Sequence, residues 1–250
     1  NIPKRGRFWP KSGPETPMHA TTELLKTFSL FKGLRDSELE SLCVKSKVVR
    51  YSRRGVVLSA GGEENKICML FEGRLQGVDF TIDGREVGLY FVEPGDYCGE
   101  LNIFESKSQP EHIIALNSVV VVLINADMVR QVASRNPEIM LELGQKLASR
   151  IRQMTNQRSL LSLPSVSQRV CNQLWMLTKT GDTKPLTSKE ITGVPTHMEF
   201  AIMLNLSRET VTRVFQQLQK QQIVSRKGPN RLMIHDLIIL REIATGSKQL

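Results

Sequence analysis

The sequence is poor in cysteine and has no long hydrophobic run. Its four cysteines, Cys43, Cys68, Cys98 and Cys171, form no CxxC pair and show no spacing typical of a disulfide framework. They indicate buried or free thiols in a reducing compartment. The valine-rich run Val119–Ile124 is far shorter than the roughly 20 residues that a membrane helix needs, and no signal peptide is recognisable. We therefore expect a cytoplasmic protein without a membrane partner.

Signatures of common enzyme and metal sites are also missing. The sequence contains no P-loop, no G-x-S-x-G, no H-E-x-x-H and no plausible pair of catalytic carboxylates, so we do not expect an enzyme. His19, His112, His197 and His235 are isolated, and without a cysteine cluster neither a metal nor haem is expected. Only His112, beside a cassette described below, remains a candidate ligand.

Positive charge is what the sequence has in excess, with 34 lysines and arginines against 25 acidic residues and a net charge of +9. This charge favours a polyanionic partner. Residues 1–20 carry four prolines among basic residues, and we expect a disordered basic tail there. The tail is either native or vector-derived, Met18 being a natural start, and disorder without a role is favoured over phosphate contact.

Short β-rich segments follow one another between residues 47 and 124. Turn residues such as Gly61-Gly62, Asp83-Gly84 and Pro94-Gly95 separate them. Even spacing of short strands with glycine-rich turns predicts an antiparallel roll or barrel, and Asp83-Gly84 between two strands predicts a hairpin.

A long helix is predicted after the roll, beginning at Pro137, because proline is well placed at a helix start. Residues 147–161 carry a seam with alternating spacings of four and three, as in the a and d positions of a coiled coil. A stripe facing the core of one subunit is the alternative, but few apolar residues elsewhere on the helix favour dimerisation. Pro164 then predicts a hinge. The apolar seam residues are Leu147, Ile151, Met154 and Leu161.

The most specific pattern lies between residues 196 and 219. Thr196 and Glu199 form a capping box that starts a short helix, and Ser207 is a good N-cap for a second helix. Asn205 between them tolerates a left-handed turn. Two helices joined in this way form a helix-turn-helix, and the segments around Lys227–Asn230 predict a β-hairpin wing behind it. The core-facing stripe of the second helix is Val211, Val214, Phe215 and Leu218.

The run SRETVTRVFQQL, which begins at Ser207, closely resembles the recognition helix of the bacterial CRP/FNR regulators. In that family the residues matching Arg208, Glu209 and Arg213 reach base edges in the major groove of DNA. Arginine can bond bidentately to guanine and glutamate can accept from cytosine, each at about 1–3 kcal/mol of discrimination. A merely solvated helix face is the alternative. The DNA contacts that we expect are Ser207, Arg208, Glu209, Thr212, Arg213, Arg226, Lys227 and Arg231.

Within the roll, Pro94–Phe104 resembles the phosphate-binding cassette of cyclic-nucleotide-binding domains, whose hallmark is the run Gly99-Glu100-Leu101. Glycine lets amides approach a phosphate at a helix N-terminus, and Glu100 would accept from a ribose hydroxyl. The arginine–serine pair that holds the phosphate in the family falls on Gln109 and Pro110, so the cassette is degenerate and lacks its charge anchor.

Met154 and Thr155 align with the positions that touch the nucleotide base in the family, and Met154 replaces the hydroxyl expected of a cAMP binder. These departures argue against cAMP and leave the cofactor unknown. The Gly99–Leu101 run is then either a turn kept for folding or part of a pocket for another ligand. The protein is accordingly either a constitutive dimer or one gated by an unknown small-molecule effector.

The predicted fold class is α+β, in three parts. Residues 1–20 form the tail, residues 21–162 a cyclic-nucleotide-binding-like β-roll (a jelly roll) with a long dimerisation helix, and residues 163–250 a winged helix-turn-helix. The resemblance implies a homodimeric, sequence-specific transcriptional regulator on a near-palindromic TGTGA-like site, and an activator would also contact RNA polymerase. The alternative is a ligand-binding or scaffold module without a role in gene regulation, whose partner binding would be insensitive to salt.

Overall fold

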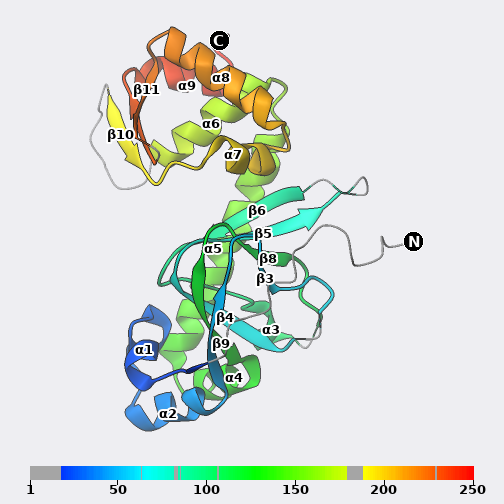
Figure 1. Cartoon of the computed structure of the whole chain (residues 1–250), viewed down its shortest axis with the longest axis vertical. Coiled ribbons are helices and arrows are strands. Elements are labelled where there is room, and N and C mark those ends of the chain that lie inside the picture. Colours follow the sequence, from blue (N-terminus) through cyan, green and yellow to red (C-terminus); the bar gives the residue numbers. More distant parts are fainter. Residues whose placement is uncertain are drawn as a thin grey trace. The chain divides into compact units, whose positions relative to one another are not determined.

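The computed structural model describes residues 18–62, 64–81, 84, 86–105, 107–178, 188–228 and 230–250. It contains two compact units (Figure 1). The first holds the described residues up to Asp79 together with Leu89–Arg152, and the second holds Phe80–Gly88 and Gln153–Leu250. None of the helices in these ranges has the length and apolar composition needed to span a bilayer.

Two antiparallel sheets form the roll, most of which belongs to the first unit. The order of the five-stranded sheet is β1-β2-β9-β4-β7, and that of the four-stranded sheet is β3-β8-β5-β6. The turn between β5 and β6 is closed by a hydrogen bond of 2.8 Å from the Gly84 amide to the Thr81 carbonyl, while Asp83 lies outside the described residues. The strands are β1 Met18–His19, β2 Ser46–Tyr51, β3 Val56–Leu58, β4 Lys66–Glu72, β5 Leu75–Phe80, β6 Glu86–Val92, β7 Tyr97–Cys98, β8 His112–Ala115 and β9 Val119–Asn125.

Strand β9 explains why the roll needs helices as well as a second sheet. All of its apolar side chains are buried, and because side chains alternate along a strand they enter two different cores. Val119, Val121 and Leu123 pack inside the roll. Val122 and Ile124 face the other way, into a core built with helices.

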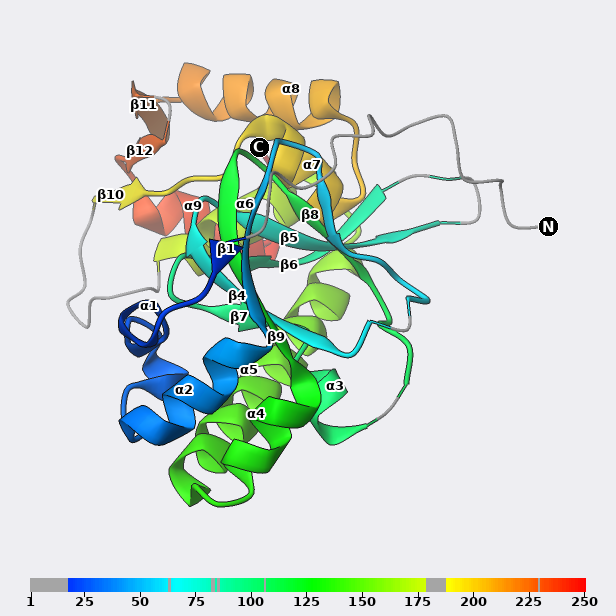
Figure 2. The ribbon, with the colours of Figure 1, turned by 60° about the horizontal axis from the view of Figure 1, so that its bottom comes forward.

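The helices of the first unit cover that outer face of β9 (Figure 2). Phe28, Leu39, Leu42, Val129 and Leu143 supply much of the apolar surface and are fully buried. The elements are α1 Thr22–Lys26, the 3-10 helix η1 Ser29–Phe31, α2 Asp36–Val44, α4 Ala126–Ala133 and the first part of α5, which runs Pro137–Leu161.

The boundary expected for the basic tail is wrong by three residues. Met18 and His19 pair with Val48 and Lys47 as an edge strand, and Ala20 is buried in the helical core. Backbone pairing along β2 holds these residues, a long-range effect that composition does not reveal. The rest of the expected tail, residues 1–17, lies outside the described part of the chain.

The second unit has the winged helix-turn-helix architecture that the sequence predicts, and this prediction is confirmed. A three-stranded sheet of order β10-β12-β11 encloses one core with the end of α5 and the helices that follow it, in which Val170, Leu174, Phe200, Phe215 and Leu240 are fully buried. The elements are α6 Val166–Thr178, β10 Lys189–Thr192, α7 His197–Leu204, α8 Arg208–Lys220, β11 Val224–Gly228, β12 Arg231–Ile234 and α9 Leu237–Thr245.

Candidate nucleic-acid interface and effector site

Helix α7 begins with the capping box that the sequence predicts. The Glu199 amide donates to the Thr196 hydroxyl at 3.3 Å, and the Glu199 carboxylate accepts from the Thr196 amide at 2.6 Å. At the other end of the helix, Asn205 adopts the left-handed conformation, with φ 50° and ψ 51°. This sharp stop lets the chain turn at once into α8.

Helix α8 presents one apolar face and one charged face. Its predicted stripe, represented by Val211 and Phe215, is buried in the core of the second unit. Arg208, Glu209 and Arg213 are exposed on the other side. Three side chains capable of base recognition therefore share the solvent-facing side of one rigid helix.

Two of the polar residues expected at this interface also have local structural roles. The Ser207 hydroxyl accepts from the Thr210 amide at 3.1 Å, and it lies 2.8 Å from the Thr210 hydroxyl. Thr212 is half-buried and donates to the Arg208 carbonyl at 2.9 Å. Ser207 thus caps α8, and Thr212 is tied to the first turn of the helix.

His197, which the sequence suggested only as an isolated histidine without a metal partner, packs into this region. Its ring stacks on Phe215 at a centroid distance of 4.6 Å, and its Nδ1 lies 3.0 Å from the Thr212 hydroxyl. Because Thr212 donates to Arg208, its oxygen is left to accept from an Nδ1–H group. Burial, followed by the charges of Arg226 and Arg208, lowers the pKa of His197 below its usual value. Its place at the first position of α7 was the only available signal.

The wing carries the basic residues expected to contact phosphates. Arg226 and Lys227 are exposed on β11, and Arg231 is exposed on β12. The ladder between the two strands is irregular between Arg226 and Gly228. Arg231 also forms an ion pair of 3.7 Å with Glu190 of β10, a solvent-exposed interaction that contributes little to stability.

The cassette in the roll turns from β7 into the short helix α3, Leu101–Phe104. Gly99 has a φ of +81°, and a Cβ at this position would lie 2.8 Å from the Lys66 carbonyl oxygen. Only glycine fits such a place without strain. Leu101 is exposed, whereas Glu100 is buried.

Glu100 is paired with an arginine from the long helix. Arg150 Nε lies 3.3 Å from Glu100 Oε1, and the guanidinium lies 3.3 Å from the centroid of the Tyr90 ring. Tyr90 packs over Gly77, where a Cβ would lie only 2.7 Å from the phenol Cζ. The stack of arginine on tyrosine therefore requires a residue without a side chain at position 77.

The positions expected to hold a phosphate contain no cation. Gln109 is buried, and its Oε1 has no hydrogen-bond partner among the described residues, while Pro110 is exposed. The next residue, Glu111, is buried and accepts a short hydrogen bond from the Tyr90 hydroxyl. Glu111 was not among the expected pocket residues, although an acidic residue directly after the phosphate positions was a visible signal.

The remaining expected positions lie on α5. Met154 is 55% exposed and Ile151 65%, while Leu147 and Leu161 are half-buried. Thr155 is exposed. The expected seam therefore leaves its middle residues largely open to solvent within one chain.

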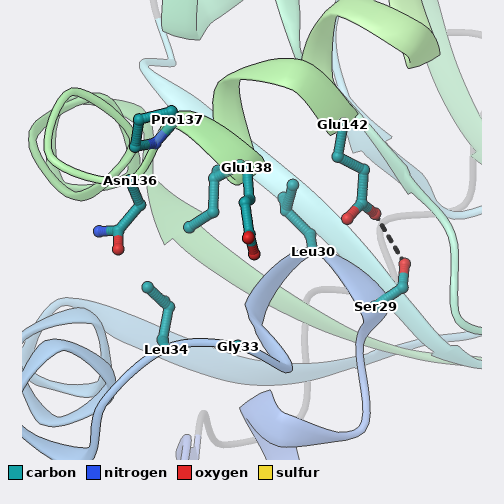
Figure 3. Close-up of a pocket in the computed structure, with 9 residues that line it drawn as sticks. Ser29, Leu30, Gly33, Leu34, Asn136, Pro137, Glu138 and Glu142 are labelled. Atoms are coloured by element: carbon teal, nitrogen blue, oxygen red, sulfur yellow. Dashed lines mark hydrogen bonds between the residues drawn. The ribbon is translucent and has the colours of Figure 1, made fainter.

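A separate surface pocket of about 350 Å³ lies at the start of α5 (Figure 3). The Ser29 hydroxyl of η1 donates to Glu142 at 2.8 Å across its rim. Glu138 gives the pocket a second carboxylate, and Leu30 and Leu34 give it an apolar side. None of the expected effector residues lines this pocket.

Across the described ranges, no group of three or more histidine, cysteine, aspartate or glutamate side chains is arranged to hold a metal ion. The cysteines there are free thiols. Burial raises the pKa of the Cys171 thiol to about 12, a direction that disfavours the thiolate needed for metal binding.

Two family models match the chain, one for each functional region. Residues 48–136 match the cyclic nucleotide-binding domain, and residues 168–243 match the Crp-like helix-turn-helix domain. Together the two matches span more than half of the chain. The chain belongs to the CRP/FNR family. It is therefore a CRP-like DNA-binding transcriptional regulator.

Relatives and solved structures agree with this assignment. The CRP-like cAMP-activated global transcriptional regulator of Mycobacterium tuberculosis is 26% identical over 84% of this chain and 94% of that protein. The cAMP-activated global transcriptional regulator CRP of Pasteurella multocida is 27% identical over 77% and 92%.

Two solved structures share the fold of this CRP/FNR protein. FixK2 from Bradyrhizobium japonicum matches with a TM-score of 0.66 at 18% identity, over 79% of this chain and 96% of that one. The c-di-GMP-responsive global regulator CLP from Xanthomonas campestris matches with a TM-score of 0.63 at 21% identity, over 80% and 99%.

Proposed function

We propose that this protein is a homodimeric regulator that reads a near-palindromic, TGTGA-like site with α8. The observation that carries the proposal is the set of exposed side chains Arg208, Glu209 and Arg213 on a helix whose opposite face is buried. Two such helices, roughly 34 Å apart in a dimer, would enter successive major grooves. Arg226, Lys227 and Arg231 of the wing would contact phosphates and set the register.

The dimer would form through α5. Exposed Ile151 and Met154, flanked by Leu147 and Leu161, offer an apolar seam that a second copy would cover. Residues 21–162 would then act as the roll with its dimerisation helix and residues 163–250 as the DNA-binding domain. RNA polymerase is the expected protein partner of an activator of this kind, and the cytoplasm is the expected location.

The effector would differ from cAMP, or DNA binding would need none. Gln109 and Pro110 supply no charge for a phosphate, and Met154 supplies no hydroxyl for a base. This sets the protein apart from its cAMP-activated relatives.

Fluorescence anisotropy of the full chain on a TGTGA-N6-TCACA duplex, with a scrambled duplex as control, tests the proposal. We expect selective binding that weakens with salt, because released counterions drive phosphate contact. Arg213→Ala is expected to lose selectivity at one G·C position. Lys220→Ala is the matched control, since it removes an exposed charge from the end of the same helix. Equal selectivity in both variants would contradict the assignment.

A second measurement addresses the dimer. Light scattering on the intact chain is expected to give twice the monomer mass, and Ile151→Glu is expected to give the monomer, because a charge would then face the seam. A monomeric wild-type chain would contradict the proposed assembly. A scaffold without a role in gene regulation would instead bind its partner independently of salt.

A further inference from the structure

Four buried side chains meet inside the roll of the first unit. Tyr90, Glu100, Glu111 and Arg150 are only 4–9% exposed. They come from β6, from the cassette, from the residue before β8 and from α5. We call them the buried quartet. Charged side chains are almost never buried to this degree unless they are paired.

The bonds of the quartet form a continuous chain. Glu111 accepts from the Tyr90 hydroxyl, the Tyr90 ring lies under the Arg150 guanidinium, and Arg150 pairs with Glu100. The pKa of the Glu111 carboxyl is raised above its usual value, chiefly by burial and also by the charge of Glu100, although the hydrogen bond from Tyr90 and the charge of Arg150 act in the opposite direction. Each of the four side chains thus contacts at least one other member of the quartet.

The charges of the quartet are unfavourable for an anionic ligand. Two carboxylates lie beside one guanidinium, which is already paired. A phosphate placed here would meet two like charges in a poorly solvated site. The one cation of the quartet, Arg150, already pairs with Glu100, so no ion pair would offset the cost of desolvating the phosphate.

A second ion pair attaches α5 to the cassette one helical turn earlier. Lys146 forms a short salt bridge with Asp96, and its ammonium lies 5.2 Å from the centroid of the Tyr97 ring. Lys146 and Arg150 are four residues apart on α5, as are Asp96 and Glu100 on the cassette. Side chains four apart share one helix face, so two matched pairs fasten that face of α5 to the roll.

We propose that Glu111 is a built-in anion that replaces a bound phosphate in the roll, so that α5 is held against the cassette without any effector. The inference rests on the proposed function and specifies its regulation: DNA binding is independent of a nucleotide, and the roll rejects anionic nucleotides.

Removing the internal anion and replacing it from solution tests this proposal. In ligand-free full-length protein, Glu111→Ala is expected to lower affinity for the TGTGA duplex at least about fivefold, the lower end of typical allosteric couplings. Sodium acetate is expected to restore that affinity, because acetate supplies the missing carboxylate, whereas sodium chloride at the same ionic strength is not. Loss of affinity without rescue by acetate, or no loss at all, would overturn the proposal.

Two further variants separate charge from folding. Glu111→Gln keeps an acceptor for Tyr90 and fills the same volume, so we expect reduced DNA affinity that acetate does not restore. Full affinity in this variant would overturn the role of the charge. Glu105→Ala is the control, since it removes a carboxylate directly after the cassette that forms an ion pair with the exposed Lys107. We expect it to behave as wild type.

Calorimetric titration with cAMP needs no DNA and therefore separates failure of this inference from failure of the proposed function. Wild type is expected to show no binding and Glu111→Ala to gain binding. Binding of cAMP by wild type would overturn the inference whatever its DNA selectivity. Conversely, absence of selective DNA binding by wild type in every condition would overturn the proposed function and leave the titration to decide the inference.

Discussion

The arginines of α8 and the arginine of the buried quartet use the same side chain in opposite ways. Arg208 and Arg213 are exposed on the solvent-facing side of their helix. Arg150 is buried, paired with Glu100 and stacked on Tyr90. A solvated guanidinium is available to an external partner at little desolvation cost, whereas a buried pair stabilises the arrangement of its own neighbours. The exposed arginines are therefore suited to recognition of a partner, whereas the buried and paired arginine stabilises the fold.

The largest effect is expected from breaking the buried pair. Arg150→Met would leave Glu100 buried without its partner, a change that typically destabilises a protein by about 3–5 kcal/mol. Urea unfolding followed by circular dichroism measures the loss. Arg152→Met on the same helix is the control, because Arg152 is exposed, and we expect a change within about 0.5 kcal/mol. Equal losses in the free energy of unfolding for the two variants would contradict the distinction between buried and exposed arginines.

A smaller effect, on binding rather than on folding, is expected from α8. Arg208→Ala is expected to reduce discrimination between the TGTGA and scrambled duplexes by about 1–3 kcal/mol. Its unfolding midpoint is expected to stay that of wild type. Gln216→Ala, also exposed on this helix, controls for a general loss of surface contact. A large fall in the stability of Arg208→Ala would mean that Arg208 also stabilises the fold.

The cap of α7 ranks next. Thr196→Ala removes the hydroxyl that accepts from the Glu199 amide, and we expect a loss of about 1 kcal/mol in the free energy of unfolding. Thr196→Ser retains the hydroxyl and is expected to recover most of it. If both variants are equally unstable, the methyl group of Thr196 matters more than its cap.

The smallest effect is a pH dependence from His197. The pKa of this residue is lowered in the folded protein, chiefly by burial and then by Arg226 and Arg208. Below pH about 6.5 the unfolded chain binds a proton that the folded chain resists, so stability falls as the pH drops through this region. Unfolding at pH 7.5 and 5.5 measures this slope, and we expect it to be shallower in His197→Gln. An unchanged slope would assign the dependence to other groups.

Local patterns explain why the helix-turn-helix was predictable and the quartet was not. Caps at Thr196 and Ser207, and the stripe on α8, depend on residues three or four apart. In the roll, Tyr90 and Glu111 are 21 residues apart, and Glu100 and Arg150 are 50 apart. Spacing in a sequence carries no information about such pairs.

The strands show the same limit. The longer strands of the roll were anticipated from β-rich runs between glycine turns, but the two-residue strands β1 and β7 were not. Two residues are too short for an alternating pattern, and their pairing with β2 and β4 is set by the rest of the sheet. The missing arginine at Gln109 was visible in the sequence. The role of Glu111, by contrast, follows only from the side chains that surround it in the structure.

Gly77 places an evolutionary constraint on a position outside the quartet itself. A Cβ there would lie 2.7 Å from the Tyr90 ring, and the ring cannot retreat because Arg150 and Glu111 hold it on its face and at its hydroxyl. Tyr90 therefore requires glycine at position 77. Among descendants of this gene we expect the two residues to be kept together or lost together, so that positions 77 and 90 co-vary as the lineage diverges.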